Sequence, residues 1–332
     1  MHPLVHDLVQ DAVPPLGGAI DVHAHYLTDR LRTAMTDAGH GMPDGMPAIP
    51  EWSPRAALEL MDQAGVRAAL LSVSSPGVHF GDDRAAAALA RSVNDEGLAL
   101  VERYPDRFGL MASLPLPDVP AAIAEAERAL DAGADGITLK THYDGSYLGD
   151  ARFDPLMELL DERSAVVCLH PTSSPCWEAT SLGHPRPMLE FPFETTRAVA
   201  NLALSRTLER CPRISFIVPH AGAALPVLAD RIAAFALMAQ PGPAVDVLVV
   251  LRRLYYDTAG FSLPRALPAL LHLVDGDRLL YGSDYPFTPG WVVQALAQGL
   301  AEDGGLTPPQ QAAMLHGNAS RLFPRFAVQS AV

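Results

Sequence analysis

Residues 18–26 read Gly-Ala-Ile-Asp-Val-His-Ala-His-Tyr, an apolar run that ends in two histidines, His23 and His25. Side chains alternate between the two faces of a strand, so both imidazoles lie on the same face if this stretch is a strand. Two imidazoles on one face are half of a divalent-metal site. The stretch alone also allows two surface histidines in a loop, so the rest of the chain has to supply the other ligands.

Seven further apolar runs follow this stretch, and helix-like amphipathic segments separate them. Runs that are nearly continuous in apolar residues are typical of strands buried on both faces of a sheet. Eight such strand–helix units predict a (β/α)8 barrel. An open doubly wound sheet is less favoured, because no glycine-rich phosphate loop follows any strand. The predicted strands are residues 19–25, 66–73, 108–114, 135–141, 165–170, 214–220, 254–258 and 278–284.

The whole chain, residues 1–332, is predicted to be one domain, with residues 1–17 as a weakly patterned lead-in. Segments rich in Pro, Gly and Ser predict long loops after the first and fifth strands, at 40–54 and 171–192. In a barrel of this kind, such loops cover the end that carries the active site. Two short helices are expected at the C-terminus, near 308–315 and 319–323.

Composition narrows the classes of partner. The net charge of −14 makes nucleic acid and anionic membrane surfaces poor candidates. The three cysteines include no CxxC pair, so neither a disulfide framework nor a zinc knuckle is indicated. Residues 1–17 do not resemble a signal peptide, and no apolar run reaches the roughly 18 residues of a membrane span. We therefore expect a cytoplasmic protein.

Polar residues stand where several of the predicted strands end, and in a barrel these ends meet at one mouth. A histidine that closes an apolar strand is hard to explain by packing, because both of its ring nitrogens need partners. The residues in question are His23 and His25 (first strand), Lys140 (fourth), His170 (fifth), His220 (sixth), Asp257 (seventh) and Asp284 (eighth).

These motifs make the chain similar to the decarboxylase-type branch of the amidohydrolase superfamily. That branch includes decarboxylases of 6-methylsalicylate, γ-resorcylate and aminocarboxymuconate semialdehyde. The resemblance extends from residue 18 to about residue 322. It rests on IDVHAHY (20–26), GITLKTHYDGSYLGD (136–150), VVCLHP (166–171), FPFETTRAVANLALS (191–205), FIVPHAGAALP (216–226), YYDTAG (255–260) and LLYGSDYPF (279–287).

The resemblance implies one divalent metal ion held by His23, His25, His170 and Asp284, with His220 and Asp284 as catalytic residues. Nitrogen and oxygen donors suit Zn²⁺ as the default ion and Mn²⁺ as the alternative. The implied reaction is non-oxidative decarboxylation of a small aromatic acid such as 6-methylsalicylate. The metal would bind the substrate carboxylate and phenolate, and Asp284 would protonate the ring carbon. No organic cofactor is required.

The sequence also allows a different reaction and several roles for Lys140. The same site would support a hydrolase or hydratase that uses metal-bound water on a lactone, an amide or an unsaturated acid. Lys140 is the only lysine of the chain, and its side chain could be a carbamylated metal bridge, a cation for the substrate or part of a structural ion pair. Proteins of this branch often form dimers, and residues 302–332 could contribute to such an interface.

The loops at the mouth supply candidates for substrate binding. Aromatic side chains there could line the site, although an aromatic in a loop also serves simply to pack the loop down. An arginine could bind the substrate carboxylate through its planar fork, or form an ordinary surface ion pair. Besides Lys140, the candidates are Trp52, Trp177, Phe191, Phe287 and Arg186. Asp257 could orient a ligand histidine or cap a loop.

Overall fold

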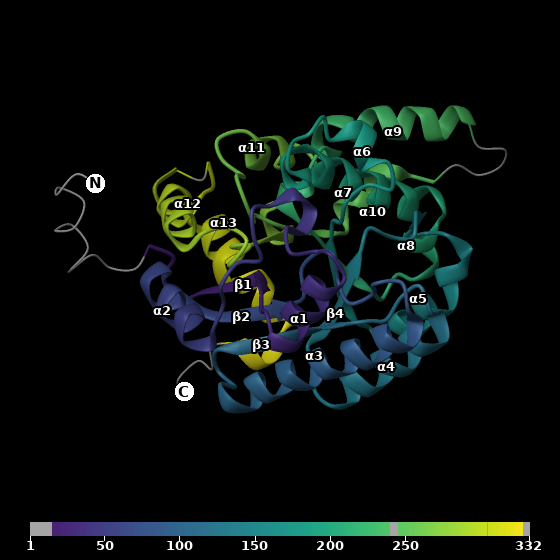
Figure 1. Ribbon diagram of the computed structural model, residues 1–332. Coiled ribbons are helices and arrows are strands. Elements are labelled where there is room, and N and C mark those ends of the chain that lie inside the picture. Colours follow the sequence, from purple (N-terminus) through teal and green to yellow (C-terminus); the bar gives the residue numbers. More distant parts are fainter. Residues whose placement is uncertain (1–14, 240–244, 304, 328–332) are drawn as a thin grey trace.

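The computed structural model describes residues 15–239, 245–303 and 305–327, and apart from residues 15–17 the predicted lead-in lies outside them. Within these ranges, eight strands form one parallel sheet in the order β1-β2-β3-β4-β7-β8-β9-β10. A parallel bridge between Asp21 and Tyr281 joins the first strand to the last and closes the sheet. Helices surround it (Figure 1), so the predicted (β/α)8 barrel is confirmed.

Most strands coincide with the predicted ones, but the eighth is shorter. Beyond Leu280 the chain still bonds to β1, less regularly: Tyr281 O accepts from Val22 N at 2.9 Å, and Asp284 N donates to His23 O at 2.7 Å. The strands are β1 (Ala19–His25), β2 (Val66–Ser72), β3 (Phe108–Ser113), β4 (Gly136–Lys140), β7 (Val166–His170), β8 (Ser215–Val218), β9 (Tyr255–Asp257) and β10 (Leu279–Leu280).

Capping residues start several of the helices. The Ser53 side chain accepts a hydrogen bond from Ala56 N, and Pro54 follows in the first turn, as the sequence predicts. The helices are α1 (Asp29–Asp37), α2 (Pro54–Ala64), α3 (Asp83–Arg103), α4 (Val119–Asp131), α5 (Asp154–Glu162), α6 (Trp177–Thr180), α7 (Arg186–Leu204), α8 (Thr207–Arg210), α9 (Leu225–Ala239), α10 (Val247–Arg252), α11 (Ala266–Leu270), α12 (Gly290–Asp303), α13 (Pro308–Ala312) and α14 (Asn318–Leu322).

The long loop predicted at 171–192 is partly helical. α7 begins at Arg186, with a proline in its first turn, where no backbone N–H is needed, and it continues through Pro192. A proline inside a helix removes one hydrogen bond, and here the flanking turns still form. α6 and α1 were also not predicted. The sequence pattern correctly marks breaks in the chain but understates the short helices between them.

A two-stranded hairpin follows β4 and was not predicted either. It pairs β5 (His142–Tyr143) with β6 (Ser146–Tyr147). Asp144 and Gly145 form its turn with φ of 48° and 79°. An Asp-Gly pair with both φ values positive is a favoured two-residue hairpin turn, so this dipeptide was a readable signal.

A small apolar cluster fills the inside of the barrel. It contains Ile20 and Val22 of β1, Cys168 of β7, and Phe323 and Phe326 from the C-terminal segment. The C-terminal helix α14 and the residues after it therefore pack against the barrel interior. Cys168 packs in this core as a small apolar side chain. The larger cluster lies between the sheet and the helices.

An irregularity in β1 decides which way the two histidines point. Ile20 and Val22 belong to the inner cluster, whereas Ala24 belongs to the outer one. Strict alternation from Val22 would place Ala24 inside. The pairing of β1 with β2 shifts register between Asp21 and Ala24. Such a bulge re-aims side chains, and here it turns His23 and His25 toward the barrel mouth.

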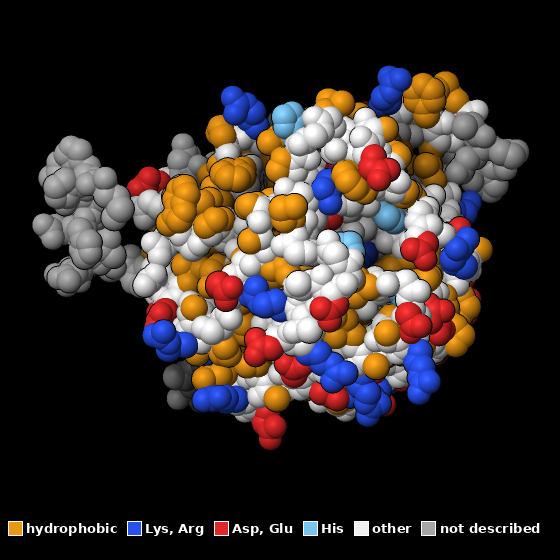
Figure 2. Space-filling model, viewed as in Figure 1, with side chains coloured by type: hydrophobic (Ala, Val, Ile, Leu, Met, Phe, Trp, Pro, Cys, Tyr) orange, Lys and Arg blue, Asp and Glu red, His pale blue; other side chains and the backbone are white. Residues whose placement is uncertain are grey.

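The surface is uneven in composition. Seen from the side shown in Figure 1, charged side chains of both signs are spread over the lower part, and hydrophobic side chains gather over α11 and α12 (Figure 2). Trp291, at the start of α12, belongs to this hydrophobic surface and is 76% exposed. Among the described residues, no helix has the length and apolar character needed to cross a membrane.

Candidate active site

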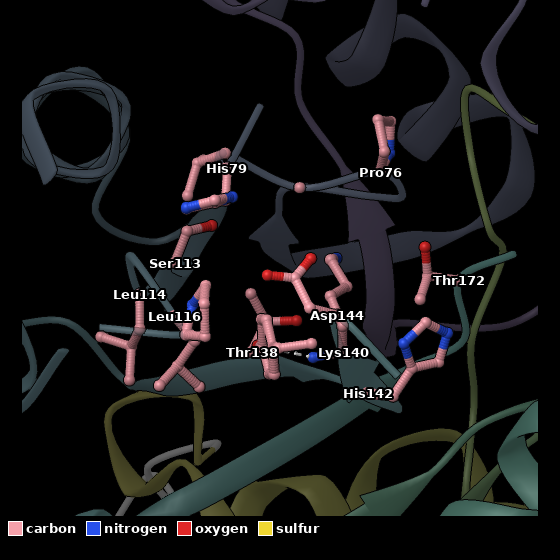
Figure 3. Close-up of a pocket in the computed structure, with 14 residues that line it drawn as sticks. Pro76, His79, Ser113, Leu114, Leu116, Thr138, Lys140, His142, Asp144 and Thr172 are labelled. Atoms are coloured by element: carbon pink, nitrogen blue, oxygen red, sulfur yellow. Dashed lines mark hydrogen bonds between the residues drawn. The ribbon is translucent and has the colours of Figure 1, made fainter. Parts of the chain in front are cut away.

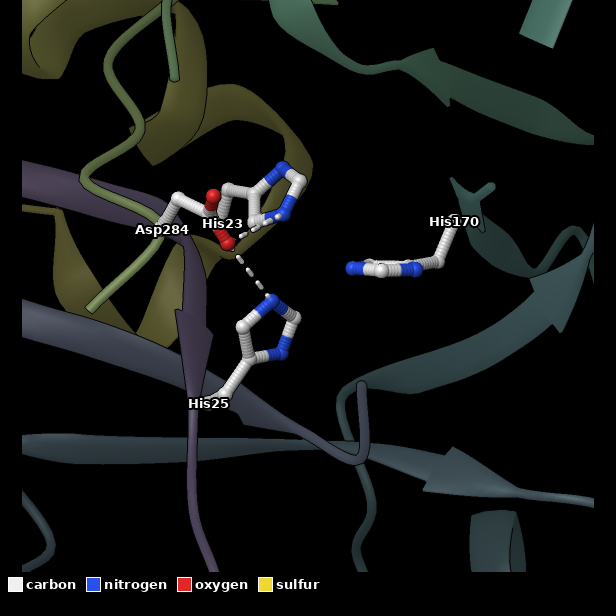
Figure 4. Close-up of side chains that lie close together, drawn as sticks. All are labelled: His23, His25, His170 and Asp284. Carbon is white, nitrogen blue, oxygen red and sulfur yellow. Dashed lines mark hydrogen bonds and ion pairs between the residues drawn. The ribbon is translucent and has the colours of Figure 1, made fainter. Parts of the chain in front are cut away.

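Four predicted residues come together at the mouth of the barrel (Figure 4). His23 and His25 end β1, His170 ends β7, and Asp284 follows β10. Each offers one nitrogen or oxygen atom, and these four atoms all lie within 4.8 Å of one another. The three histidines are buried, and Asp284 is partly buried. A cluster of this composition and spacing could hold one divalent metal ion.

His23 presents its Nε2 atom to the centre of the cluster. Its Nδ1 atom is 2.8 Å from Asp257 Oδ2, which makes Nδ1 the protonated nitrogen. His23 Nε2 is buried and has no hydrogen-bond partner within the described part of the chain; its nearest acidic atom is Asp284 Oδ1 at 3.6 Å. A buried ring nitrogen without a partner is costly unless a ligand takes it. This atom is therefore the clearest sign that the site is built for a metal ion.

The other two histidines are oriented in the same way. His25 Nδ1 lies 2.9 Å from Ser72 Oγ, and His170 Nδ1 lies 2.7 Å from the carbonyl oxygen of Pro171. In each ring, the paired Nδ1 leaves Nε2 as the atom that faces the cluster. Metal-binding histidines are commonly oriented by such bonds to the other ring nitrogen. The three imidazoles and one carboxylate thus fit a metal site in both donor type and orientation.

The electrostatics of the cluster favour cation binding. Burial lowers the pKa of His25 to about 4, and burial also lowers the pKa of His170. Burial would lower the pKa of His23 as well, but the Asp257 carboxylate beside it raises that pKa to about 9. Burial would raise the pKa of Asp284, but the histidines around it lower that pKa to about 2. Because the pKa of His23 is raised, its ring is protonated near pH 7, and a metal ion that binds Nε2 has to displace a proton.

Asp257 supports the site with both of its oxygens. Oδ2 accepts from His23, and Oδ1 accepts from the backbone N–H groups of His220 and Ala259, each at 3.0 Å. Both readings of this residue, histidine orientation and loop capping, therefore hold. His220 sits at φ 58°, a left-handed conformation, and its ring lies 5.1 Å from that of His23. Burial lowers the pKa of His220, so its ring is neutral near pH 7.

A cavity of about 640 Å³ opens onto the cluster. His170, His220 and Asp284 form its polar end, and most of its remaining wall is apolar. Phe191 and Phe287 line it, as predicted; their rings lie 6.2 Å from His170 and 5.6 Å from His25, respectively. Within the described residues, no lysine or arginine lines this cavity.

Three other candidates lie elsewhere. Trp52 borders a separate small cavity behind β1 and packs against Tyr26. The Arg186 guanidinium stacks on Trp177 at 4.1 Å, and its Nε donates to Ser173 Oγ at 3.0 Å. Neither tryptophan nor this arginine is on the wall of the large cavity, because all three pack the loops that frame it.

Lys140 also lies apart from the large cavity. It is buried at the end of β4, where its Nζ donates to the carbonyl oxygen of Val73 at 2.6 Å. Burial lowers the pKa of its amine to about 7. Lys140 makes no ion pair among the described residues and faces a second, smaller cavity, so a structural ion pair does not explain it.

Sequence reasoning missed three polar residues of the large cavity, Asp44, Ser74 and Thr288. Ser74 Oγ lies 3.3 Å from His170 Nε2. Asp44 is buried in a turn at φ 52° and accepts a hydrogen bond from Ser173. The Pro-Asp-Gly sequence at 43–45 was a readable turn signal, but nothing local placed that turn over the mouth.

With this geometry established, comparison with known proteins gives the family. A family model described as amidohydrolase matches residues 20–325. The chain belongs to the amidohydrolase family. The 6-methylsalicylic acid decarboxylase of Penicillium expansum is 37% identical to this amidohydrolase over 315 residues, which cover 92% of this chain and 96% of that protein. The predicted resemblance to the decarboxylase-type branch is confirmed.

Solved structures agree with the fold. A crystal structure of a protein named amidohydrolase II aligns with a TM-score of 0.89 at 38% identity, covering 92% of this chain and all of that one. The dihydroxybenzoic acid decarboxylase of Polaromonas sp. JS666, solved with bound manganese and the inhibitor 2-nitroresorcinol, aligns with a TM-score of 0.78 at 24% identity. That alignment covers 93% of this chain and 97% of the other. At this identity it supports the barrel fold.

Proposed function

We propose that this amidohydrolase is a metal-dependent decarboxylase of a small hydroxybenzoic acid of the 6-methylsalicylate type. The observation that carries the proposal is the set of three imidazoles whose Nδ1 atoms are all occupied, leaving Nε2 atoms beside Asp284 at the end of a largely apolar cavity. The 37% identical relative named 6-methylsalicylic acid decarboxylase supports the choice of reaction.

His23, His25, His170 and Asp284 would hold one divalent ion. When bound, the ion would act as a Lewis acid toward the carboxylate and the neighbouring phenolic oxygen of the substrate. The donor set suits Zn²⁺, which binds such sites tightly, and Mn²⁺ is the alternative. The ring of the substrate would lie in the apolar part of the cavity, between walls that include Phe191 and Phe287.

The lowered pKa of Asp284 makes it a carboxylate in the resting site. To act as an acid, Asp284 has to receive a proton first, and the phenolic hydroxyl of the substrate can supply one. Asp284 then passes this proton to the ring carbon that bears the carboxylate. The C–C bond breaks, its electron pair returns to the ring, and CO2 leaves. The product forms as a phenolate, because its own hydroxyl supplied the proton: HO–Ar–CO2⁻ gives ⁻O–ArH plus CO2, and the phenolate then takes up one proton from solvent.

His220 lines the same end of the cavity as Asp284. Its ring borders the cavity and is neutral near pH 7, so it can accept a hydrogen bond from the phenolic hydroxyl and position that proton. Thr288 Oγ1 donates to Asp284 Oδ2 at 3.4 Å and orients the carboxylate. The apolar wall excludes water, which strengthens these interactions.

The test is product analysis with the metal-loaded enzyme and a metal-stripped control. We expect 6-methylsalicylate to be converted to 3-methylphenol and CO2 only by the metal-loaded enzyme, with Zn²⁺ and Mn²⁺ compared in reconstitution. Absence of CO2 from this and related hydroxybenzoates would overturn the proposal. Running lactone and amide substrates in ¹⁸O-labelled water tests the hydrolase alternative, because a hydrolase incorporates the label and a decarboxylase does not.

Three further expectations from the sequence belong to this proposal. These are the single domain over residues 1–332, the cytoplasmic location and the homodimer. The part of the 302–332 tail that the structure describes bears on the last of these. Phe323 and Phe326 are buried in the barrel interior, so these side chains are not available to a partner subunit.

A further inference from the structure

The barrel mouth holds a second cavity, around Lys140, with a volume of about 150 Å³ (Figure 3). It is lined from the ends of β3 and β4 and from the loops after β2 and β7. It shares no lining residue with the 640 Å³ cavity at the metal cluster. The mouth is therefore divided into an apolar compartment beside the cluster and a polar one beside Lys140.

Three buried donors converge on this polar compartment. Thr138 and Lys140 are two residues apart on β4, so their side chains lie on one face, and Ser113 of β3 is the register partner of Thr138. The three residues are 3%, 6% and 5% exposed, and all line the cavity. Thr138 Oγ1 is buried and has no hydrogen-bond partner in the described ranges.

Lys140 also has hydrogen-bond donors without partners among the described residues. Its Nζ carries three hydrogens when charged, and one of them is used by Val73 O. A buried ammonium with unused hydrogens and a buried hydroxyl without a partner are unfavourable, so such groups are normally satisfied by a ligand or by water. The lowest-energy occupant of this cavity is one that accepts several hydrogen bonds and carries negative charge.

Three polar groups near Lys140 do not take up its remaining hydrogens. The buried Asp44 carboxylate attracts the charge of the lysine but makes no ion pair with it in the described part of the chain. His142 already uses both ring nitrogens, since Nε2 lies 2.9 Å from Ser173 O and Nδ1 accepts from Gly145 N at 3.4 Å. Asp144 lines the cavity but is exposed and makes no ion pair with Lys140 within the described residues. Water and salt screen an exposed carboxylate, so it repels an anion only weakly.

We propose that this compartment binds a small carboxylate- or carbonate-type anion, held by Lys140 Nζ and the hydroxyls of Thr138 and Ser113. Residues i and i+2 of a strand are about 7 Å apart, and two or three oxygens on one anion span that distance with hydrogen bonds of about 2.8 Å. The volume of about 150 Å³ equals about five water molecules, which suits an anion of three or four heavy atoms. Bicarbonate is the member of this class that forms when the CO2 released by the proposed decarboxylation reacts with water (CO2 plus H2O gives HCO3⁻ plus H⁺), and only this clause rests on the proposed function.

The single lysine of the chain makes the site directly observable. Protein grown with [ε-¹³C]lysine gives one side-chain NMR signal. The Zn²⁺-loaded enzyme is titrated with sodium formate or sodium bicarbonate at constant ionic strength, and sodium chloride serves as the comparison salt. We expect a saturable shift of the Lys140 signal with the oxyanions. If bicarbonate binds more tightly than formate, the anion that this site takes up is the one derived from the CO2 product.

Two threonine variants separate this site from the metal centre. Thr138→Val removes one donor without changing the size of the side chain and should weaken anion binding about tenfold, because hydrogen bonds to charged groups are the strong ones. The matched control is Thr195→Val, which removes another buried hydroxyl without a partner, on α7, and should leave binding unchanged.

Several results would overturn the proposal. An equal shift with chloride would mean a general salt effect, and unchanged affinity in Thr138→Val would place the anion at the metal ion. Displacement of the anion by 2-hydroxybenzoate would show that the two compartments are one site. None of these measurements depends on turnover, so failure of the decarboxylase assay would leave them interpretable.

Discussion

Asp257→Asn tests how the protein sets the protonation of its histidines. The substitution keeps an oxygen that can accept from the backbone N–H groups of His220 and Ala259, but it places an amide NH2 against His23 Nδ1, 2.8 Å away. Two donors then face each other, so the neutral His23 ring, which is the form that binds a metal ion, keeps its one proton on Nε2 and not on Nδ1. That proton occupies the lone pair meant for the metal ion.

The expected effect is a loss of metal affinity. Removing the partner that orients a metal-binding histidine typically costs 10- to 100-fold, which corresponds to about 1.4–2.7 kcal/mol. We expect this range because the Asp257 carboxylate is only 2% exposed, and water therefore cannot replace it. Competition with a chromophoric chelator measures the dissociation constant of Zn²⁺ for each variant.

The matched control is Asp161→Asn. Asp161 is also buried and also accepts a backbone N–H, from Arg213 at 2.7 Å, but it lies outside the site. This variant should lower the thermal midpoint without changing metal affinity. If folded Asp257→Asn bound Zn²⁺ within about threefold of the unaltered protein, the argument that Asp257 sets the His23 tautomer would be refuted.

Three further outcomes are expected. Ser72→Ala removes the 2.9 Å partner of His25 Nδ1 but leaves Ser72 O at 3.3 Å, so the same chelator competition should show a smaller loss of Zn²⁺ affinity, about fivefold; a 100-fold loss would contradict this. Gly136→Ala places a Cβ 2.4 Å from the carbonyl oxygen of Val166 inside the sheet and should cost about 1–3 kcal/mol in urea unfolding, whereas Gly299→Ala in α12 meets nothing within 4 Å and should not destabilise. In D2O, mass spectrometry of the phenolic product should find one deuterium at the carbon that carried the carboxylate, and a product without it would exclude protonation of that carbon.

The sequence predicted correctly those strands and helix ends that depend only on neighbouring residues. Each of the eight apolar runs predicted as a strand became one, since burial on both faces of the sheet selects the same residue types. The cap at Ser53 and the proline after it were predictable because capping involves only neighbouring residues. The start of α7 was not, because a Pro-rich stretch is compatible with both a loop and the first turn of a helix.

The residues that line the large cavity were also predicted only in part. Phe191 and Phe287 line the large cavity as expected, whereas Trp52, Trp177 and Lys140 do not. In the sequence, all of these residues are predicted to lie in loops or at strand ends, although Trp177 and Phe191 prove to be helical. Which of them line the cavity depends on the conformation of the segments after β1 and β7. Tertiary contacts such as the stacking of Arg186 on Trp177 decide that conformation.

From residues 18–26 alone, the sequence determined that His23 and His25 share one face of a strand, because side chains alternate. Only the tertiary structure decided which face. The irregularity between Asp21 and Ala24 turns both imidazoles inward, and closure of the barrel brings His170 and Asp284 to them from distant strands. Alternation is a property of a few consecutive residues, whereas register and closure depend on pairing between strands far apart in the chain.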